Sequence, residues 1–267
     1  MKELKLRSLS GLLYVALIIS SALYSDLSFI LVVFIFSSLA LYEFQKLIKY
    51  RSPVPFLLFA LVVFQFYEQK IHHNLQLSLL GLSVSTNLVL TYLLLSHKNI
   101  TLQPLQKLVV TFFYIISSAY FIVATSSLES SIANGISISM YLLIWVNNSF
   151  AYLFGKRWGK TPLFKKISPK KSWEGFWGGA AMCLLISFVL IPYHPDYPRW
   201  TFPFLAIVIA IAATVGDLIQ SKFKRQAAVK DSGSLIPGHG GFYDRMDSVL
   251  YTAPFIFLLL MLIRYVS

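Results

Sequence analysis

Long apolar stretches alternate with short polar ones along the whole chain. Runs of roughly 17 to 25 residues, the length needed to cross a bilayer, recur from one end to the other. Stretches such as FLLFALVVF are continuously apolar, whereas the strands of a transmembrane barrel alternate, so helices are favoured. The pattern predicts an all-α polytopic membrane protein with about nine transmembrane helices, near residues 8–24, 27–45, 53–67, 75–95, 104–126, 136–154, 174–192, 202–220 and 248–266. The second and third are the least distinct.

The composition agrees with this prediction. Of the 267 residues, 57% are hydrophobic and only 13% are charged, about half the charged fraction of a soluble domain. The single cysteine, Cys183, lies inside the seventh predicted span and can form no intramolecular disulfide. We interpret it as a small core residue.

Basic residues concentrate on one side of the predicted membrane. If the N-terminus lies in the cytoplasm, 20 of the 23 Lys and Arg residues fall on the cytoplasmic side, the exceptions being Lys70, Arg199 and Arg264. This asymmetry follows the positive-inside rule and places the C-terminus outside. It also explains most of the net charge of +12, so no nucleic-acid partner is expected.

Two cytoplasmic polar loops, at residues 155–173 and 221–247, hold 12 of those 20 basic residues. That is more than orientation requires, and it predicts contact with anionic lipid or a polyphosphate ligand. Both loops lie in the second half of the chain. We therefore expect residues 1–135 to form a scaffold of about five spans, with a candidate dimer or lipid-access region, and residues 136–267 to form the catalytic region. A homodimer is expected.

Two groups of polar residues interrupt the apolar spans, and each has two interpretations. Glu43 lies near the cytoplasmic end of the second span, where it either snorkels to the interface or faces a polar cavity. Asn147 and Asn148 interrupt the sixth span. They either join helices by hydrogen bonds or point into a ligand cavity.

The first polar loop ends in the sequence SPKKSWEG. Lys170 and Lys171 follow Pro169, which limits the local backbone, and Ser172 precedes a stretch typical of a helix start. A helix N-terminus flanked by lysines attracts phosphate oxygens. These residues, with Ser168, are therefore candidates for phosphate binding, whereas for the lysines from 156 to 166 a topology-setting basic loop is the favoured of the two interpretations.

Carboxylates gather at the ends of the last two predicted spans. Asp217 shares one helix face with residues 220–221, and Asp244 shares one with residues 247–248, since both sets have i, i+3, i+4 spacing. A buried Asp is costly to keep ionised unless a cation accompanies it. Hard cations prefer carboxylate oxygens, so the candidate magnesium ligands are Asp217, Asp231, Asp244 and Asp247.

The connection between these helices contains a PGHGG turn. Its glycines, Gly240 and Gly241 among them, let backbone N–H groups approach an anion. His239 is open to three roles: metal ligand, phosphate donor or turn-stabilising side chain. The cations that can hold phosphate oxygens here are Lys224, Arg225, Lys230 and Arg245. We expect metal-assisted phosphate chemistry at the cytoplasmic membrane face, above a polar cavity lined by predicted spans six, eight and nine.

The segment from Ser221 to Asp247, SKFKRQAAVKDSGSLIPGHGGFYDRMD, resembles the signature of the phosphatidate cytidylyltransferase family, also called CDP-diacylglycerol synthases. ISPKKSWEGFWGG and GDLIQS resemble two further family blocks. The resemblance is strong from about Trp145 to the C-terminus. In the first half it is limited to hydropathy and to YEF around Glu43.

The resemblance implies that CTP and phosphatidate react to CDP-diacylglycerol and pyrophosphate, in phospholipid biosynthesis at a bacterial inner membrane. It implies Mg²⁺, or another divalent cation such as Mn²⁺, with room for a second metal ion. Asp217 and Asp244 would be the principal metal ligands and Asp231 and Asp247 secondary ones, with Lys230 also catalytic. The residues implied to bind phosphates of CTP or phosphatidate are Ser168, Lys170, Lys171, Ser172, Ser221, Lys224, Arg225, His239, Gly240, Gly241 and Arg245.

One departure from the family pattern concerns Asn148, where the family has an acidic residue in a W-x-x-D-S context. Asn keeps a carbonyl ligand but removes a charge, which puts in doubt an essential ionic role at this position. Ser172 stands where the family has Thr, and the hydroxyl is kept. The competing interpretations are a CTP-dependent lipid kinase, a transporter with Asp217, Glu43 and Asn148 along its pathway, and a purely structural membrane subunit.

Overall fold

The computed structural model describes residues 2–68, 70–96, 98–128, 135–236 and 240–266, and it is predominantly helical. The helices are α1 (Lys2–Tyr24), α2 (Asp26–Leu47), α3 (Val54–Tyr67), α4 (His73–Leu95), α5 (Pro104–Val110), η1 (Thr111–Ile116), α6 (Ser117–Ser126), α7 (Gly135–Trp158), α8 (Trp173–Leu190), η2 (Ile191–Tyr193), α9 (Thr201–Gln226) and α10 (Tyr243–Val266). Two of the helical elements are not α-helices: η1 is a π-helical turn and η2 is a 3-10 turn.

The prediction of a helical membrane protein is confirmed. Within the described residues, seven helices are long and apolar enough to cross a membrane, and the shorter apolar helices Ser10–Tyr24 and Val54–Tyr67 match the first and third predicted spans. The second predicted span is full-length, with 22 residues in α2, so only the third of the two less distinct spans is short. Helices α9 and α10 extend beyond their predicted ends, which shortens the second polar loop to residues 227–242.

The first polar loop is not wholly irregular. Strands β1 (Pro162–Phe164) and β2 (Ser168–Ser172) pair as a two-stranded antiparallel hairpin. The prediction of an all-α protein did not include this hairpin. Pro162 and Pro169 each remove a backbone donor and oppose helix formation, but proline is tolerated in strands that have a free edge. The hairpin leads directly into α8, since β2 ends at Ser172 and α8 begins at Trp173. The Trp173 N–H donates to the Thr161 carbonyl at 3.0 Å and so holds the start of α8 against the start of the hairpin.

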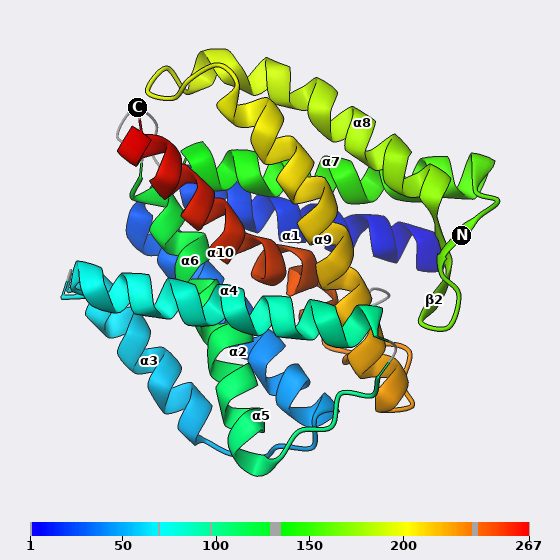
Figure 1. Ribbon diagram of the computed structural model, residues 1–267, viewed down its shortest axis with the longest axis horizontal. Helices are drawn as coiled ribbons and strands as arrows, with labels where there is room; N and C mark the ends of the chain where they lie inside the picture. Colours follow the sequence, from blue (N-terminus) through cyan, green and yellow to red (C-terminus); the bar gives the residue numbers. More distant parts are fainter. Residues whose placement is uncertain (1, 69, 97, 129–134, 237–239, 267) are drawn as a thin grey trace.

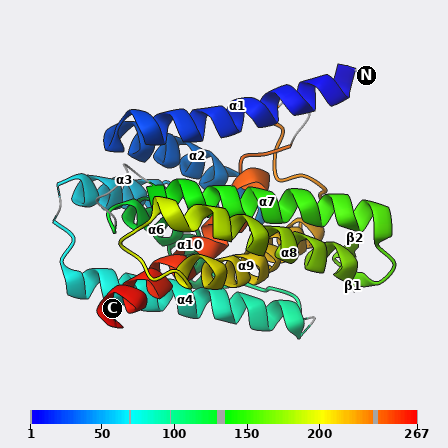
Figure 2. The same cartoon turned by 90° about the horizontal axis from the view of Figure 1, so that it is seen from above.

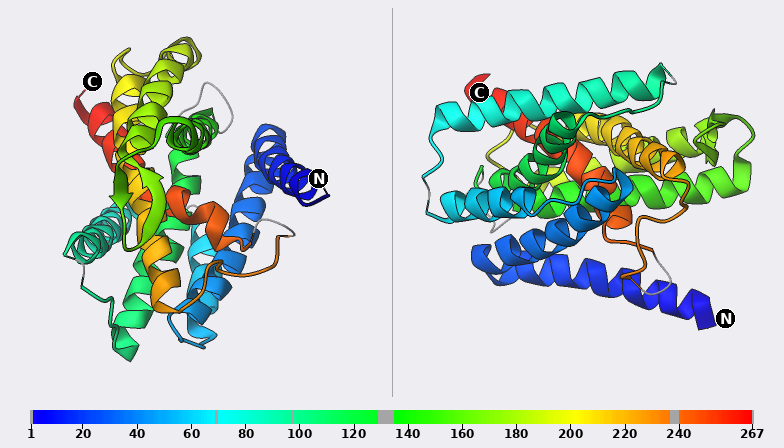
Figure 3. Two further views of the ribbon diagram at one scale, coloured as in Figure 1. Left: turned by 90° about the vertical axis from the view of Figure 1, so that its right-hand side faces the viewer. Right: turned by 90° about the horizontal axis from the view of Figure 1, so that it is seen from below.

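Helix α10 occupies the middle of the bundle. It packs against α9, α6 and α2, while α1 and α4 lie on opposite flanks of the molecule (Figures 2 and 3). The N-terminus and the hairpin lie at one end of the longest axis, and the C-terminus lies at the other end (Figure 1). The two polar connections that carry the candidate site residues therefore belong to the half of the molecule away from the C-terminus.

Polar side chains join the helices inside the bundle. The Ser83 and Ser117 hydroxyls lie 2.7 Å apart, and the Asn87 side chain of α4 donates to the Tyr251 carbonyl of α10 at 3.2 Å. Near the candidate site, the Tyr114 hydroxyl from η1 lies 2.9 Å from that of Tyr243 at the start of α10. Such hydrogen bonds satisfy groups that hydrocarbon would leave without partners.

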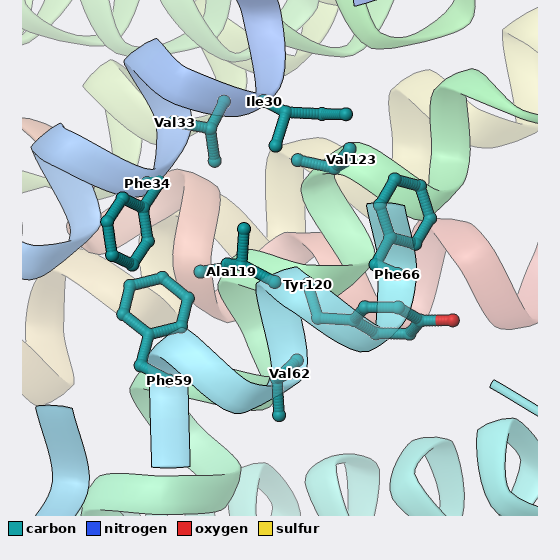
Figure 4. Close-up of a pocket in the computed structure, with 10 residues that line it drawn as sticks. Ile30, Val33, Phe34, Phe59, Val62, Phe66, Ala119, Tyr120 and Val123 are labelled. Carbon is teal, nitrogen blue, oxygen red and sulfur yellow. The ribbon is translucent and has the colours of Figure 1, made fainter. Parts of the chain in front are cut away.

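A small apolar cavity of about 20 Å³ lies between α2, α3 and α6 (Figure 4). The Phe34 and Phe59 rings meet beside it, with their centroids 4.9 Å apart. Tyr120 is the one lining residue with a polar group, and its hydroxyl accepts a hydrogen bond from Gln76 at 2.8 Å. This cavity therefore belongs to the hydrocarbon packing and has no features of a polar site.

The contact between α9 and α10 depends on Gly216. A methyl group at this position would lie 2.6 Å from the Tyr251 Cβ and 3.0 Å from the Asp247 carbonyl oxygen. Both distances are too short for unstrained packing. The absence of a side chain thus lets the two helices approach where they carry Asp217 and Asp247.

Gly216→Ala should lower the stability of the folded protein by about 1–3 kcal/mol, the usual cost of overpacking. Unfolding in detergent, followed by circular dichroism, measures the change. Gly81→Ala is the matched control, because no atom lies within 4 Å of a Cβ at Gly81. Equal melting temperatures for the two variants would contradict the tight contact.

Candidate active site

A cavity of about 700 Å³ opens between α7, the hairpin, α8 and α9. Its lining combines four lysines with an acid, an amide and several aromatic or apolar side chains. The lining residues include Asn148, Tyr152, Lys156, Lys160, Lys170, Lys171, Ser172, Phe176, Thr214 and Asp217. The prediction that span nine lines the cavity is wrong: α8, which is span seven, takes that place because its start follows the hairpin closely.

Asp217 forms an ion pair with Lys171 at the wall of this cavity. The Lys171 Nζ lies 2.5 Å from Asp217 Oδ2, and the two side chains are 26% and 34% exposed. Ser221, one turn further along α9, donates weakly to Asp217 Oδ1 at 3.4 Å. The ion pair thus connects β2 of the hairpin to α9. The Asp217 carboxylate remains accessible to solvent and to a ligand.

The hairpin places its lysines by a defined local structure. Ser172 caps α8, since its hydroxyl accepts the Gly175 N–H at 3.1 Å, as the sequence predicted. Lys170 and Lys171 immediately precede this cap in β2 and line the cavity. Ser168 begins the same strand but is absent from the lining residues.

Glu174 is a positioning residue that the sequence analysis missed. Its carboxylate accepts the N–H groups of Lys160 and Thr161 at 3.1 Å each, and so fixes the start of the hairpin to the first turn of α8. An acidic residue in the first turn of a helix was the available signal, because negative charge is favoured there.

Asn148 joins α7 to α10. Its amide donates to the Ser248 hydroxyl at 3.1 Å, and that hydroxyl donates to the Ala213 carbonyl of α9 at 3.1 Å. Asn148 also borders the cavity, so both interpretations apply to it: it joins helices by hydrogen bonds and it is accessible to a ligand. Asn147 is buried and donates to the Asn148 side-chain oxygen at 3.3 Å.

Asp247 lies on α10 beside Asp217 of α9. The two carboxylates are close enough for their charges to interact, although Asp247 is only 7% exposed. Its Oδ1 accepts the Ser248 N–H at 2.6 Å. The predicted shared face of Asp244, Asp247 and Ser248 exists, because α10 begins at Tyr243.

Asp244 is held by protein donors on both carboxylate oxygens. Oδ1 accepts Lys224 Nζ at 2.6 Å and Gln220 Nε2 at 2.8 Å. Oδ2 accepts the Ser232 and Gly241 N–H groups, each at 2.9 Å, and lies 2.9 Å from the Ser232 hydroxyl, whose single proton is shared with Glu43 Oε2 at 2.7 Å. The Lys224–Asp244 pair is largely buried, with side chains 12% and 9% exposed. This arrangement leaves neither oxygen available to a further ligand.

The remaining predicted cations are placed differently from one another. Arg225 donates to the Ile167 carbonyl at 3.3 Å and to the Val229 carbonyl at 3.2 Å, so it braces the hairpin against the end of α9. Lys230 and Asp231 are exposed on the loop. Arg245 is in the first turn of α10. None of these four is among the residues that line the cavity.

The turn of the second polar loop is partly described. Gly240 has a φ of +85°, which favours glycine, and its carbonyl accepts the Ile236 N–H at 2.9 Å. The Gly241 N–H points to Asp244 rather than to an open anion site. His239 lies outside the described residues.

Glu43 does not snorkel. Its side chain, on α2, is buried with 2% exposure, and its carboxylate accepts hydrogen bonds from the second polar loop and the start of α10. It is not among the residues that line the cavity. Glu43 therefore faces neither the interface nor the ligand cavity; its carboxylate contacts the second polar loop.

These carboxylates fit a metal ion unequally. Asp217 borders the cavity and is partly exposed, so it fits as an oxygen ligand of a hard cation. Asp247, whose charge interacts with that of Asp217, is the second candidate, although it is buried and is not among the residues that line the cavity. Asp244 does not fit as a direct ligand, because four N–H donors already occupy its oxygens, two on each. Among the residues that the structure describes, no three His, Cys, Asp or Glu side chains form a ready metal-binding group.

The chain belongs to the cytidylyltransferase family. The model described as "Cytidylyltransferase family" matches residues 5–263. Proteins named phosphatidate cytidylyltransferase from Staphylococcus epidermidis and Bacillus subtilis are each 29% identical to this chain, and the alignments cover 96% and 98% of it and 99% of each relative. One from Staphylococcus aureus is 39% identical over 122 residues, which is 45% of this chain and 46% of the relative. The chain is therefore a membrane-embedded nucleotidyltransferase.

Lys224→Met should destabilise the protein by about 3–5 kcal/mol, because it leaves Asp244 buried without its counter-charge. Unfolding in detergent measures the loss. Asp244→Asn added to Lys224→Met should recover part of it.

Lys70→Met is the matched control for that substitution. Lys70 also pairs with an acid, Glu68, at 3.2 Å, but the two side chains are 59% and 37% exposed. Exposed pairs contribute little to stability. If Lys70→Met lost as much stability as Lys224→Met, burial would not be the reason for the effect at Lys224.

Proposed function

We propose that this protein is a phosphatidate cytidylyltransferase that joins CTP to phosphatidate and releases pyrophosphate at the cytoplasmic membrane face. One observation carries the proposal: a cavity of about 700 Å³ whose wall holds four lysines and the Lys171–Asp217 pair. The family and the names of relatives aligned over nearly their full length support the same reaction.

The lysines would bind the phosphates of the substrates. Lys156 and Lys160 come from the end of α7 and the following residues, and Lys170 and Lys171 come from β2, so positive charge approaches the cavity from two sides. A cavity of this size is within the range for nucleotide-sized ligands, about 300–1,000 Å³. Aromatic and apolar side chains, Tyr152 and Phe176, complete the wall.

The reaction needs positioning more than proton transfer. An oxygen of the phosphatidate phosphate attacks the α phosphorus of CTP, a new P–O–P bond forms, and the bond to the leaving pyrophosphate breaks. A phosphate monoester is already anionic at neutral pH, so no general base is required for this step. Fixed positive charge near the reacting phosphates stabilises the charge on the leaving group.

A divalent cation of the magnesium class is part of the proposal. Asp217 and Asp247 would hold it, and it would supply positive charge for the departing pyrophosphate. Lys171, which pairs with Asp217 at the cavity wall, would supply a second positive charge to a substrate phosphate. Asp244 and Lys224 would position α10 instead of binding the ion.

The location at the membrane surface is supported by exposed tryptophans near the hairpin. Trp158, Trp173 and Trp177 are 57%, 44% and 64% exposed at the adjoining ends of α7 and α8. Tryptophan is enriched at the level of the lipid head groups. The basic-residue asymmetry and the bacterial relatives support a bacterial inner membrane with the site on the cytoplasmic side. A homodimer stays a prediction, which native mass measurement in detergent tests.

Asp217→Asn should reduce cytidylyl transfer by about 10²-fold or more, because it removes the negative charge that would hold the divalent cation at the reacting phosphates. The assay uses phosphatidate, Mg²⁺ and CTP labelled separately on the α and γ phosphates. The α label should enter the lipid with the wild type, and far more slowly with Asp217→Asn. Glu68→Gln, which removes an exposed carboxylate at the end of α3, should retain full activity.

Two other outcomes of this assay would contradict the proposal. Transfer of the γ label to the lipid would identify a lipid kinase. Absence of both labels from the lipid would favour the interpretation of the protein as a transporter.

Removal of divalent cations by EDTA should abolish transfer of the α label, and added Mg²⁺ or Mn²⁺ should restore it, because the proposed site holds hard cations through carboxylate oxygens. The labelled-CTP assay measures both steps. Full activity after exhaustive chelation would remove the metal from the mechanism.

A further inference from the structure

We propose that Glu43, from the first half of the chain, is a positioning residue for the reaction. It holds the described parts of the loop that leads into α10, residues 231–236 and 240–242, together with Tyr243 at the start of α10, and thereby fixes Asp244 and Asp247. The statement about the reaction rests on the proposed function, whereas the statement about the loop does not.

The contacts of Glu43 connect α2 to both ends of this loop. Oε2 accepts the Ser232 hydroxyl at 2.7 Å and the Tyr243 N–H at 2.9 Å, and Oε1 accepts the Phe242 N–H at 3.1 Å. The first N–H groups of a helix have no partner within the helix, and the positive end of the helix dipole favours an anion. Glu43 therefore caps α10 from a different helix.

Two glycines of the loop make this approach sterically feasible. A Cβ at Gly233 would lie 2.3 Å from Glu43 Oε1, and a Cβ at Gly241 would lie 2.0 Å from Glu43 Oε2. Both distances are far inside van der Waals contact. The loop is therefore wrapped around the carboxylate, and residue 43 accounts for glycine at both positions.

Ser232 links Glu43 to the α10 carboxylates. Its hydroxyl lies 2.7 Å from Glu43 Oε2 and 2.9 Å from Asp244 Oδ2, and its N–H donates to the same Asp244 oxygen. Asp247 follows Asp244 by one helical turn on the same face. An altered Glu43 would thus shift the loop and the first turn of α10 together, and with them Asp247, whose charge interacts with that of Asp217.

Loop order can be measured without any activity. The chain has one cysteine, Cys183, which is 0% exposed, so a cysteine introduced at the exposed Ser234 is the accessible thiol. In the Ser234→Cys background, Glu43→Gln should raise the rate of maleimide labelling about tenfold, since an amide places a donor against the N–H groups. Glu68→Gln in the same background should label at the parental rate.

Steady-state kinetics then separate positioning from simple loss of folded protein. Per folded molecule, Glu43→Gln should lower kcat by about 10–100-fold, the range seen when the partners of site residues are changed, with a smaller effect on KM for CTP. Glu43→Asp, which keeps the charge but not the reach, should lie between Glu43→Gln and the wild type.

Glycine variants keep the test decisive if Glu43→Gln does not fold. Gly233→Ala should accelerate labelling at position 234, and Gly81→Ala, which meets no atom within 4 Å, should not. In a Glu43→Ala background, Gly233→Ala should add little, because its steric partner is gone. Neighbouring residues that share a contact show this non-additivity.

The proposal is overturned if Glu43→Gln retains the parental labelling rate and kcat, or if the Glu43 and Gly233 effects are additive. A variant that yields less folded protein, but with unchanged labelling and kcat per folded molecule, would assign Glu43 a structural role only. A wild type that forms no CDP-diacylglycerol, while Glu43→Gln still accelerates labelling, would reject the proposed function and retain the positioning of the loop.

Discussion

A carboxylate inside a membrane protein must be supplied with donors, and this requirement organises the site end of the bundle. Asp244 draws Lys224 and Gln220 from α9 and Ser232 and Gly241 from the loop onto one side chain. An isolated charge at that depth would cost several kcal/mol. The ends of α9 and α10 and the loop between them are therefore held in one arrangement by the need to satisfy a single acid.

The two halves of the chain contribute differently to this arrangement. The cavity is built from α7, the hairpin, α8 and α9, all from the second half. The first half supplies Glu43, which caps α10, and Tyr114, which reaches Tyr243 from the π-helical turn. The division of the sequence into scaffold and catalytic region thus describes where the cavity lies, but the scaffold reaches into the supports of the site.

Several site residues could be found from local sequence patterns. The i, i+3, i+4 spacing put Asp244, Asp247 and Ser248 on one face, and Ser172 began a helix, because both features depend on a few neighbouring residues. The partners of Glu43 could not be found in this way, since the hydrogen bonds join residues 189 or more positions apart. The same holds for Asp244, whose many donors remove it from the candidate metal ligands.

The sequence by itself determined the helical membrane fold, the family and the clustering of charge at two connections, since apolar run length, motif spacing and residue type need no knowledge of contacts. Only the tertiary structure decided that α8 rather than α10 lines the cavity, that Lys171 pairs with Asp217, and that Glu43 faces the loop. The physical reason is that pairing depends on distance in space. Many partners were available to each charged group, and helix packing selected one.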